Sequence, residues 1–254
     1  MLFYKKYYFF VFFLSFIANI SSATETKITL FTEDYQPPFN MLVNEKISGL
    51  ATELTEELFK RIKIPYEIIM LPWARAINRT QKEPNTALFA TARTPEREQL
   101  FKWVGPILKN RWVLYAKKGS NIKISNIEDA KKYVVGGYNE DAFTSYLLNN
   151  GFIRGGNLDI SLNQKSNILK LENKRIDLWA VGEMQGAWLA KEMNIKNIIP
   201  LYAAKEINLF IAFNKDTDDS LINKLNLTFD KMKNEINILN IYKKYGIERN
   251  VGNF

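Results

Sequence analysis

The sequence predicts an α/β fold in which strands and helices alternate along the chain. The segment 27–31 alternates apolar and polar residues as a half-buried strand does. An amphipathic helix is expected over 49–62, where leucine or isoleucine recurs at every fourth position. A second strand at 65–71, a helix that begins at Pro72 and a buried strand at 86–90 repeat the order. This alternation is typical of a sheet covered by helices.

The same alternation continues to the end of the chain. Further strands are expected at 112–116, 133–137, 175–181, 198–201 and 208–213, and helices at 127–132, 140–149, 163–173 and 183–193. A long helical stretch from Asp219 to Tyr245 follows, with large apolar residues on one stripe. The polar, glycine-containing segment 117–121 is a candidate boundary between two lobes.

The first 23 residues have the features of a secretory signal. Lys5 and Lys6 precede a mostly apolar run over 7–20, and small residues at 21–23 suit cleavage. The run is shorter than the roughly 20 residues that span a bilayer. We therefore expect a cleaved signal peptide and a soluble, exported mature chain from Thr24; the alternative is an uncleaved anchor.

Composition narrows the classes of function. The chain has no cysteine, which suits a bacterial periplasm better than a small disulfide-bonded extracellular domain. It has no histidine, so a zinc site and a Ser-His-Asp triad are excluded. The net charge is +8, or +6 without Lys5 and Lys6, and the charges are dispersed. Nucleic-acid binding is not expected from such a pattern.

The most informative local pattern is the turn Thr94-Pro95-Glu96-Arg97, directly after a buried strand. Thr94 suits a helix N-cap and Pro95 suits the first helical position. A strand-to-helix junction with free backbone N–H groups beside a guanidinium can hold a small anion. The alternative is a surface turn in which Arg97 forms an ordinary ion pair.

Several motifs together resemble a known family. They are the Tyr35–Phe39 loop, Gly49-Leu50 with Glu53-Leu54, the turn at 94–97 followed by Phe101, the Lys174–Asp177 segment and the terminal 241–246 segment. In this order and spacing, the chain is similar to the bacterial extracellular solute-binding proteins of family 3, which serve polar amino-acid uptake. The segments Pro72–Ala76 and Trp103–Pro106 resemble a divergent branch of that family.

The resemblance implies the type II fold of periplasmic binding proteins: two α/β lobes, two hinge strands and a ligand cleft between the lobes. Residues 24–115 and 208–254 would form lobe 1, and residues 116–207 lobe 2. The carboxylate-gripping arginine of the family falls on Arg97, and the aromatic residues that cover the ligand fall near Tyr35, Phe39 and Trp73.

Two departures concern the ligand. The segment 135–137 leads into Tyr138-Asn139-Glu140-Asp141, whose two acids would repel a carboxylate. An aspartate that holds an ammonium in amino-acid binders is replaced by Gly182, beside Glu183. We hypothesise that the ligand is not a standard α-amino acid or binds in a shifted pose. The candidate ligand-binding residues are Tyr35, Phe39, Trp73, Arg75, Thr91, Arg97, Tyr138, Glu140, Asp141 and Glu183.

The expected function is capture of a small polar or charged solute in the periplasm, by a monomer without cofactor or metal, for the permease of an ABC-type importer. Two alternatives stay open. One is an exported, dehydratase-like enzyme that uses Glu140, Asp141 or Glu183 as acid or base. The other is a ligand sensor for a membrane receptor.

Overall fold

The computed structural model describes residues 27–247, and the expected signal peptide at 1–23 lies outside the described residues. The strands are β1 (Ile28–Glu33), β2 (Met41–Val43), β3 (Lys46–Ser48), β4 (Tyr66–Leu71), β5 (Thr86–Ala92), β6 (Phe101–Lys117), β7 (Val135–Tyr138), β8 (Leu158–Ser161), β9 (Leu178–Gly182) and β10 (Ile198–Asn214). The helices are α1 (Leu50–Ile62), α2 (Trp73–Lys82), α3 (Ala142–Asn149), α4 (Gln164–Glu172), α5 (Glu183–Glu192), α6 (Asp219–Met232) and α7 (Ile236–Lys244), with the 3₁₀ helices η1 (Pro95–Leu100) and η2 (Ile127–Lys132).

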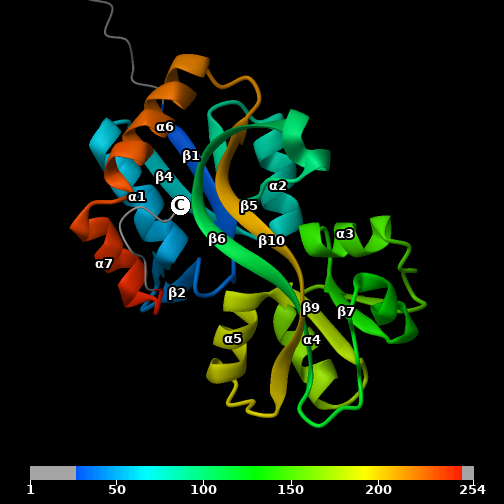
Figure 1. The fold of residues 1–254 in the computed structure, drawn as a ribbon. Coiled ribbons are helices and arrows are strands. Elements are labelled where there is room, and N and C mark those ends of the chain that lie inside the picture. The colour runs from blue at the N-terminus through cyan, green and yellow to red at the C-terminus, as the bar shows by residue number, and fades with distance from the viewer. Residues whose placement is uncertain (1–26, 248–254) are drawn as a thin grey trace, which may run out of the picture.

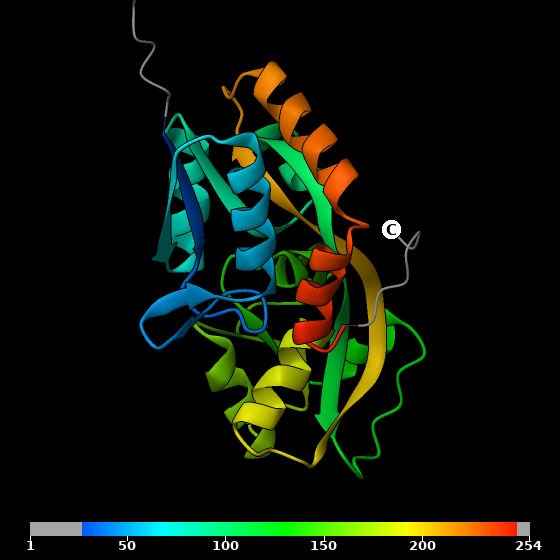
Figure 2. The same cartoon turned by 90° about the vertical axis from the view of Figure 1, so that its left-hand side faces the viewer.

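The expected two-lobed α/β fold is confirmed. The order of the main sheet is β4-β1-β5-β10-β6-β9-β7-β8. Lobe 1 contains β1–β5 with α1, α2, α6 and α7, and lobe 2 contains β7–β9 with α3, α4 and α5 (Figure 1). β6 and β10 pair antiparallel along their length and run through both lobes. Figure 2 shows these two strands passing from the upper lobe into the lower one.

The core of lobe 1 forms where α1 packs on the sheet. Leu54 and Leu58 are fully buried, as the four-residue repeat of the helix predicts. The ring of Phe59, on the same helix, stacks at 6.4 Å on Phe213 of β10. Tyr242 of α7 donates a 2.6 Å hydrogen bond to the carbonyl of Ile107, which attaches the last helix to β6.

The core of lobe 2 is built around two tryptophans. Trp179 of β9 is fully buried, and its indole N–H donates a 2.7 Å bond to Gln164. Trp112 of β6 stacks on Phe143 of α3 with the ring centroids 5.1 Å apart. Burial of aromatic surface of this size stabilises the lobe and fixes α3 and α4 beside the hinge strands.

Several local predictions differ from the structure. The strand expected at 112–116 is the end of β6, which begins at Phe101, and the helix expected at 127–132 is the 3₁₀ helix η2. The strands expected at 198–201 and 208–213 are one strand, β10, because pairing with β6 continues through the exposed residues between them. The expected helix 219–245 is two helices, which separate at Lys233–Glu235. The β2–β3 hairpin and β8 were not expected at all, because three or four residues carry too little periodicity.

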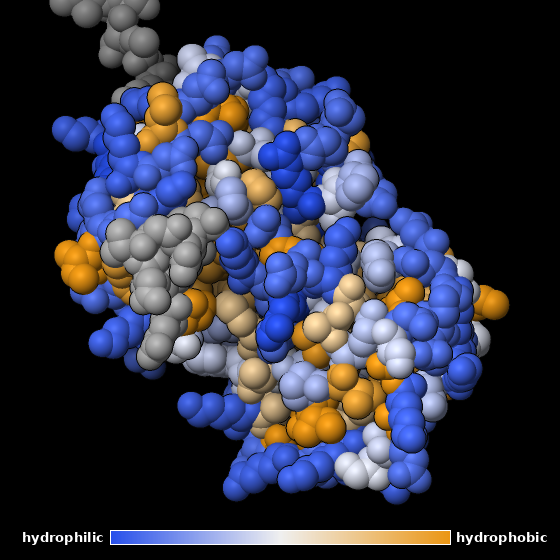
Figure 3. Space-filling view, viewed as in Figure 1, coloured by the Kyte–Doolittle hydropathy of each residue, from blue (hydrophilic) through white to orange (hydrophobic). Residues whose placement is uncertain are grey.

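The expected lobe boundaries stay a prediction. The limits at 115/116 and 207/208 both fall inside long strands, β6 and β10, that pair in both lobes. Over the described residues, no helix is both long and apolar enough to cross a membrane. Figure 3 shows a mostly hydrophilic face with separate apolar patches.

Candidate functional site

A small cavity lies between the lobes, beside the middle of the hinge strands. Its volume is about 40 Å³. Lobe 1 contributes Glu33, Gln36, Phe39, Trp73, Ala90, Ala92 and Arg97; lobe 2 contributes Asp141, Gln164, Gly182 and Gln185; the hinge strands contribute Asn110, Trp112, Ile207 and Leu209. Charged and amide groups from both lobes thus meet aromatic walls, an arrangement typical of small-molecule sites.

Arg97 reaches this cavity from η1, just after β5. Its side chain is buried, and the residue is only 8% exposed. Its guanidinium donates to the carbonyl of Ala92 at 3.4 Å and, across the cleft, to the carbonyl of Glu140 at 3.1 Å. The N-cap expected of Thr94 is wrong: its side chain makes no capping bond, because the segment forms a 3₁₀ turn instead of an α-helix.

Trp73 binds the same carbonyl. It is the first residue of α2 and is buried, and its indole N–H donates a 2.9 Å bond to the Glu140 carbonyl. The guanidinium carbon of Arg97 lies 5.1 Å from the centroid of the Trp73 ring. Glu140 has a positive φ of 57°, so its backbone is in the left-handed region while its side chain is exposed. One lobe 2 carbonyl therefore holds two side chains of lobe 1.

Asp141 follows at the start of α3. Its carboxylate accepts a 3.0 Å bond from the backbone N–H of Phe143 and so caps the helix. Burial raises the pKa of Asp141, while the charge of Arg97 and the first N–H groups of α3 act in the opposite direction. Burial also lowers the pKa of Arg97, which an arginine tolerates without losing its proton.

Glu33 closes the opposite side of the cavity, at the end of β1. It is 4% exposed, and its carboxyl is hydrogen-bonded to the hydroxyl of Tyr138. Burial raises the pKa of Glu33 from 4.5 to about 8, and the nearby acids Asp34 and Asp141 add to the effect. This carboxyl is therefore largely protonated at neutral pH.

Sequence reasoning missed the amide groups of the site. Gln164 and Gln185 lie in the first turns of α4 and α5, which follow strands of lobe 2. Asn110 lies on β6, and its amide nitrogen would be 2.6 Å from a Cβ at Gly182. Gln185 follows the expected strand at 175–181, and this position could have found it, because ligands bind at the carboxyl ends of strands. Gln164 follows β8, which the sequence does not predict, so no such signal was present for it.

Six of the predicted residues do not line this cavity: Tyr35, Arg75, Thr91, Tyr138, Glu140 and Glu183. Arg75 is exposed on α2, and Thr91 is fully buried and donates to the carbonyl of Leu88 at 3.0 Å. Tyr35 lines a wider groove of about 490 Å³ at the mouth of the cleft, together with Tyr138 and Lys165. There the Tyr35 hydroxyl donates to Glu192 across the cleft, and Lys165 lies 4.0 Å from its ring.

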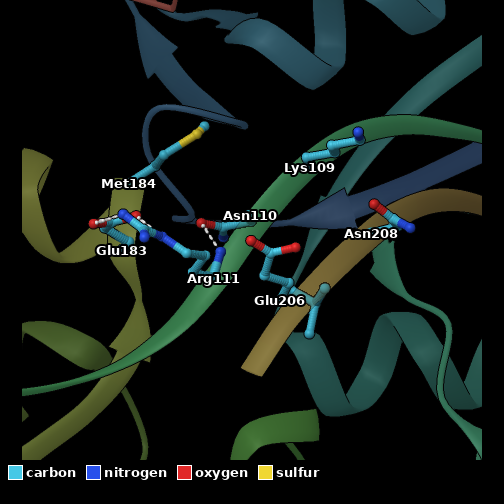
Figure 4. A pocket seen from close by; sticks show the side chains of 8 residues that line it. Lys109, Asn110, Arg111, Glu183, Met184, Glu206 and Asn208 are labelled. Carbon is cyan, nitrogen blue, oxygen red and sulfur yellow. Dashed lines mark hydrogen bonds and ion pairs between the residues drawn. The ribbon is translucent and has the colours of Figure 1, made fainter. Parts of the chain in front are cut away.

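Glu183 lines a different pocket, on the hinge. This pocket of about 420 Å³ shares Asn110 and Ile207 with the cavity. Figure 4 shows Glu183 paired with Arg111 of β6, near Glu206 and Met184. The two bonds of the pair measure 2.7 and 2.6 Å. Glu183 is thus held by an arginine instead of facing the cavity.

The cavity offers several groups that can bind a polar molecule. Within 27–247, no three acidic, histidine or cysteine side chains gather as a metal site would require. The polar groups present are one guanidinium, two carboxyls and several amides. Such a set can hold a polar molecule by hydrogen bonds on all sides.

Solved structures of similar fold include both binding proteins and a sensor. A histidine kinase sensor domain with similarity to periplasmic binding proteins has a TM-score of 0.80 at 16% identity, covering 88% of this chain and 98% of that one. The arginine-, lysine-, histidine-binding protein ArtJ of Geobacillus stearothermophilus has a TM-score of 0.78 at 20% identity, covering 88% and 97%. An ancestral arginine-binding protein bound to arginine has a TM-score of 0.76 at 19% identity, covering 86% and 97%.

No curated protein matches the sequence. The family comparison is decisive: residues 28–248, most of the chain, match the family described as bacterial extracellular solute-binding proteins, family 3. With two lobes, two hinge strands and a polar cavity between them, the chain belongs to the bacterial extracellular solute-binding proteins of family 3.

Proposed function

We propose that this protein is exported to the periplasm by its N-terminal signal and captures a small polar solute between its lobes for delivery to a membrane permease. The observation that carries the proposal is the cavity, where buried polar groups of both lobes converge. Arg97 and Glu33 lie on one side, and Asp141 and Gln185 on the other. A solute in contact with both sides would favour the closed arrangement, which is how a binding protein couples capture to closure.

The cavity must open to admit a solute. Its 40 Å³ has room for only a few water molecules, far below the roughly 300 Å³ of common ligand pockets. β6 and β10 connect the lobes as two adjacent strands, so bending there would separate Asp141 from Arg97. The contacts of Glu140 with Trp73 and Arg97 would break at the same time.

A thermal-shift screen of the mature chain against polar metabolites tests the proposal. A solute at 100 times its dissociation constant should raise the free energy of unfolding by about 2.7 kcal/mol. The same solute should lose its effect on Arg97→Ala and keep it on Arg75→Ala, because Arg75 is exposed and lines no part of the cavity. A panel that stabilises neither the wild type nor the Arg75 control would count against solute capture.

A second candidate is a sensor role. The histidine kinase sensor domain has this fold, and the partner would then be a membrane receptor. Uptake of the solute in cells that lack the gene separates the two roles: loss of uptake supports delivery to a permease, and normal uptake with a lost transcriptional response supports sensing. We also propose that the protein is not an enzyme, which mass spectrometry of the recovered solute tests directly.

A further inference from the structure

We propose that Asp141 is a built-in carboxylate that fills the anion site between Arg97 and α3, so that the cleft takes a small polar solute without a carboxylate. This inference rests on the proposed function and deepens it. Asp141 would then be the residue that determines specificity against carboxylates. Three observations carry the inference: the capped start of α3, the position of Arg97 and the free groups of the cavity.

The first step concerns the start of α3. The N-terminus of a helix of this length attracts an anion through its free N–H groups and its dipole. Here the anion is part of the chain, because the Asp141 carboxylate accepts a 3.0 Å bond from the N–H of Phe143. A solute carboxylate could not bind these groups without displacing Asp141.

The second step concerns Arg97. This buried guanidinium is the cationic group of the cavity, and it already donates to two backbone carbonyls. The second of these belongs to Glu140, the residue before Asp141, so the guanidinium lies beside the capped end of α3. Asp141 lines the same cavity and attracts Arg97 electrostatically. An added carboxylate would meet a like charge in a desolvated space.

The third step concerns the groups that stay free. Gln185 is 6% exposed and lines the cavity, and its side-chain amide makes no hydrogen bond to a residue in 27–247. Its amide can both donate and accept hydrogen bonds. Across the cavity, the protonated carboxyl of Glu33 can also do both. Asn110 fills the space next to Gly182, where a Cβ would lie 2.6 Å from its amide nitrogen. These groups carry no positive charge, so they offer a solute hydrogen bonds without favouring a carboxylate.

The test pairs a substitution with matched probes. Asp141→Ser keeps an N-capping side chain and removes the carboxylate. The probes are L-arginine with agmatine and glycine with methylamine, in which each amine lacks the carboxylate of its partner. Isothermal titration measures both pairs with the wild type and with the variant. Glu140→Ser is the control, because the Glu140 side chain is an exposed carboxylate directly beside the site.

We expect the Asp141→Ser protein to bind at least one of the two amino acids about tenfold tighter than the wild type does. The affinity for the matching amine should not change. Adding Arg97→Ala to the Asp141→Ser protein should remove the gain in affinity for the amino acid. Two results would overturn the inference: a wild type that binds either amino acid through Arg97, or a folded Asp141→Ser protein with no gain for either one. Circular dichroism verifies the fold, and Asp141→Thr replaces the serine variant if that variant unfolds.

The outcome separates this inference from the proposed function. A gain of amino-acid binding in Asp141→Ser supports the role of Asp141 even if no natural solute is found for the wild type. If the wild type captures a carboxylate-free solute outside the cavity, and Arg97→Ala leaves that binding unchanged, the proposed site is wrong. A gain of amino-acid affinity in Asp141→Ser would still support the role of Asp141.

Discussion

Two arginines connect the lobes of this protein, and they do so in opposite ways. Arg97 is buried and bonds to backbone carbonyls on both sides of the cavity. Arg111 lies on the hinge, has a side chain that is 48% exposed, and forms a bidentate pair with Glu183. Both arginines make hydrogen bonds to the other side, but only the guanidinium of Arg97 is shielded from solvent. We therefore expect the burial of Arg97, more than the length of its hydrogen bonds, to make it the stronger connection between the closed lobes.

The largest effect is expected for Arg97→Ala. Removal of this guanidinium leaves the carbonyls of Ala92 and Glu140 without its hydrogen bonds and the half-buried Asp141 without a nearby positive charge. The free energy of unfolding in urea should fall by roughly 3 kcal/mol, because buried acceptors that lose a charged donor are costly. A loss below about 1 kcal/mol would place Arg97 in the same class as a surface arginine.

Glu33→Gln should change the pH dependence of stability. The folded-state pKa of Glu33 is about 8 and its ordinary value is 4.5, so between these values the folded protein holds a proton that the unfolded chain has released. The contribution of protonated Glu33 to the stability of the folded protein is therefore complete below pH 4.5 and is lost as the pH rises to about 8. Glutamine cannot ionise. Between pH 4.5 and 8, the free energy of unfolding of the variant should therefore fall by roughly 2–4 kcal/mol less than that of the wild type.

Melting curves between pH 4.5 and 8.5 measure that difference. Asp34, Tyr138 and Asp141 are the groups that influence Glu33, and all three stay in the variant. Glu45→Gln is the matched control, because Glu45 is exposed and is not among the groups that shift the pKa of Glu33. Equal pH profiles for the wild type and Glu33→Gln would show that Glu33 is not protonated in the closed protein.

Trp73→Phe should have an intermediate effect. The phenylalanine keeps an aromatic wall and loses the indole N–H that bonds to Glu140. Loss of one such bond should cost about 1 kcal/mol, measured as a few-fold weaker affinity for the captured solute. Trp103→Phe is the control, because its N–H bonds to Glu98 within lobe 1. If both variants bind alike, the Trp73 bond does not contribute to closure.

Arg111→Ala should have the smallest effect. The pair with Glu183 is half-exposed, so its loss should lower the free energy of unfolding by about 1 kcal/mol or less. The loss should shrink further in 1 M salt, where exposed charges are screened. An effect of Arg111→Ala as large as that of Arg97→Ala would contradict the distinction between the two arginines.

Much of lobe 1 could be predicted from the sequence, because its elements have local signals. The leucine spacing of α1 and the apolar strands β1, β4 and β5 correspond to the observed elements within a few residues. The middle of β10 has no such signal. Its residues Ala203, Lys205 and Glu206 are exposed, and only pairing with β6 makes them a strand.

The site could be predicted in part for the same reason. Phe39, Trp73, Arg97 and Asp141 line the cavity. The family resemblance pointed to the first three, and Asp141 stood out as an acid at an expected helix start. Glu33, Gln164 and Gln185 belong to different elements that only the tertiary fold brings together. A single sequence holds no pattern that connects them. Likewise, nothing in the sequence indicated that Arg111 would take Glu183 away from the cavity.

A crystal structure with a solute selected by the thermal-shift screen would show directly whether the cavity is the binding site. We expect the solute to lie between the lobes, in contact with Glu33 and Gln185, with Asp141 still beside Arg97. A solute bound at the hinge pocket next to Arg111, with the cavity between the lobes unchanged, would contradict this expectation.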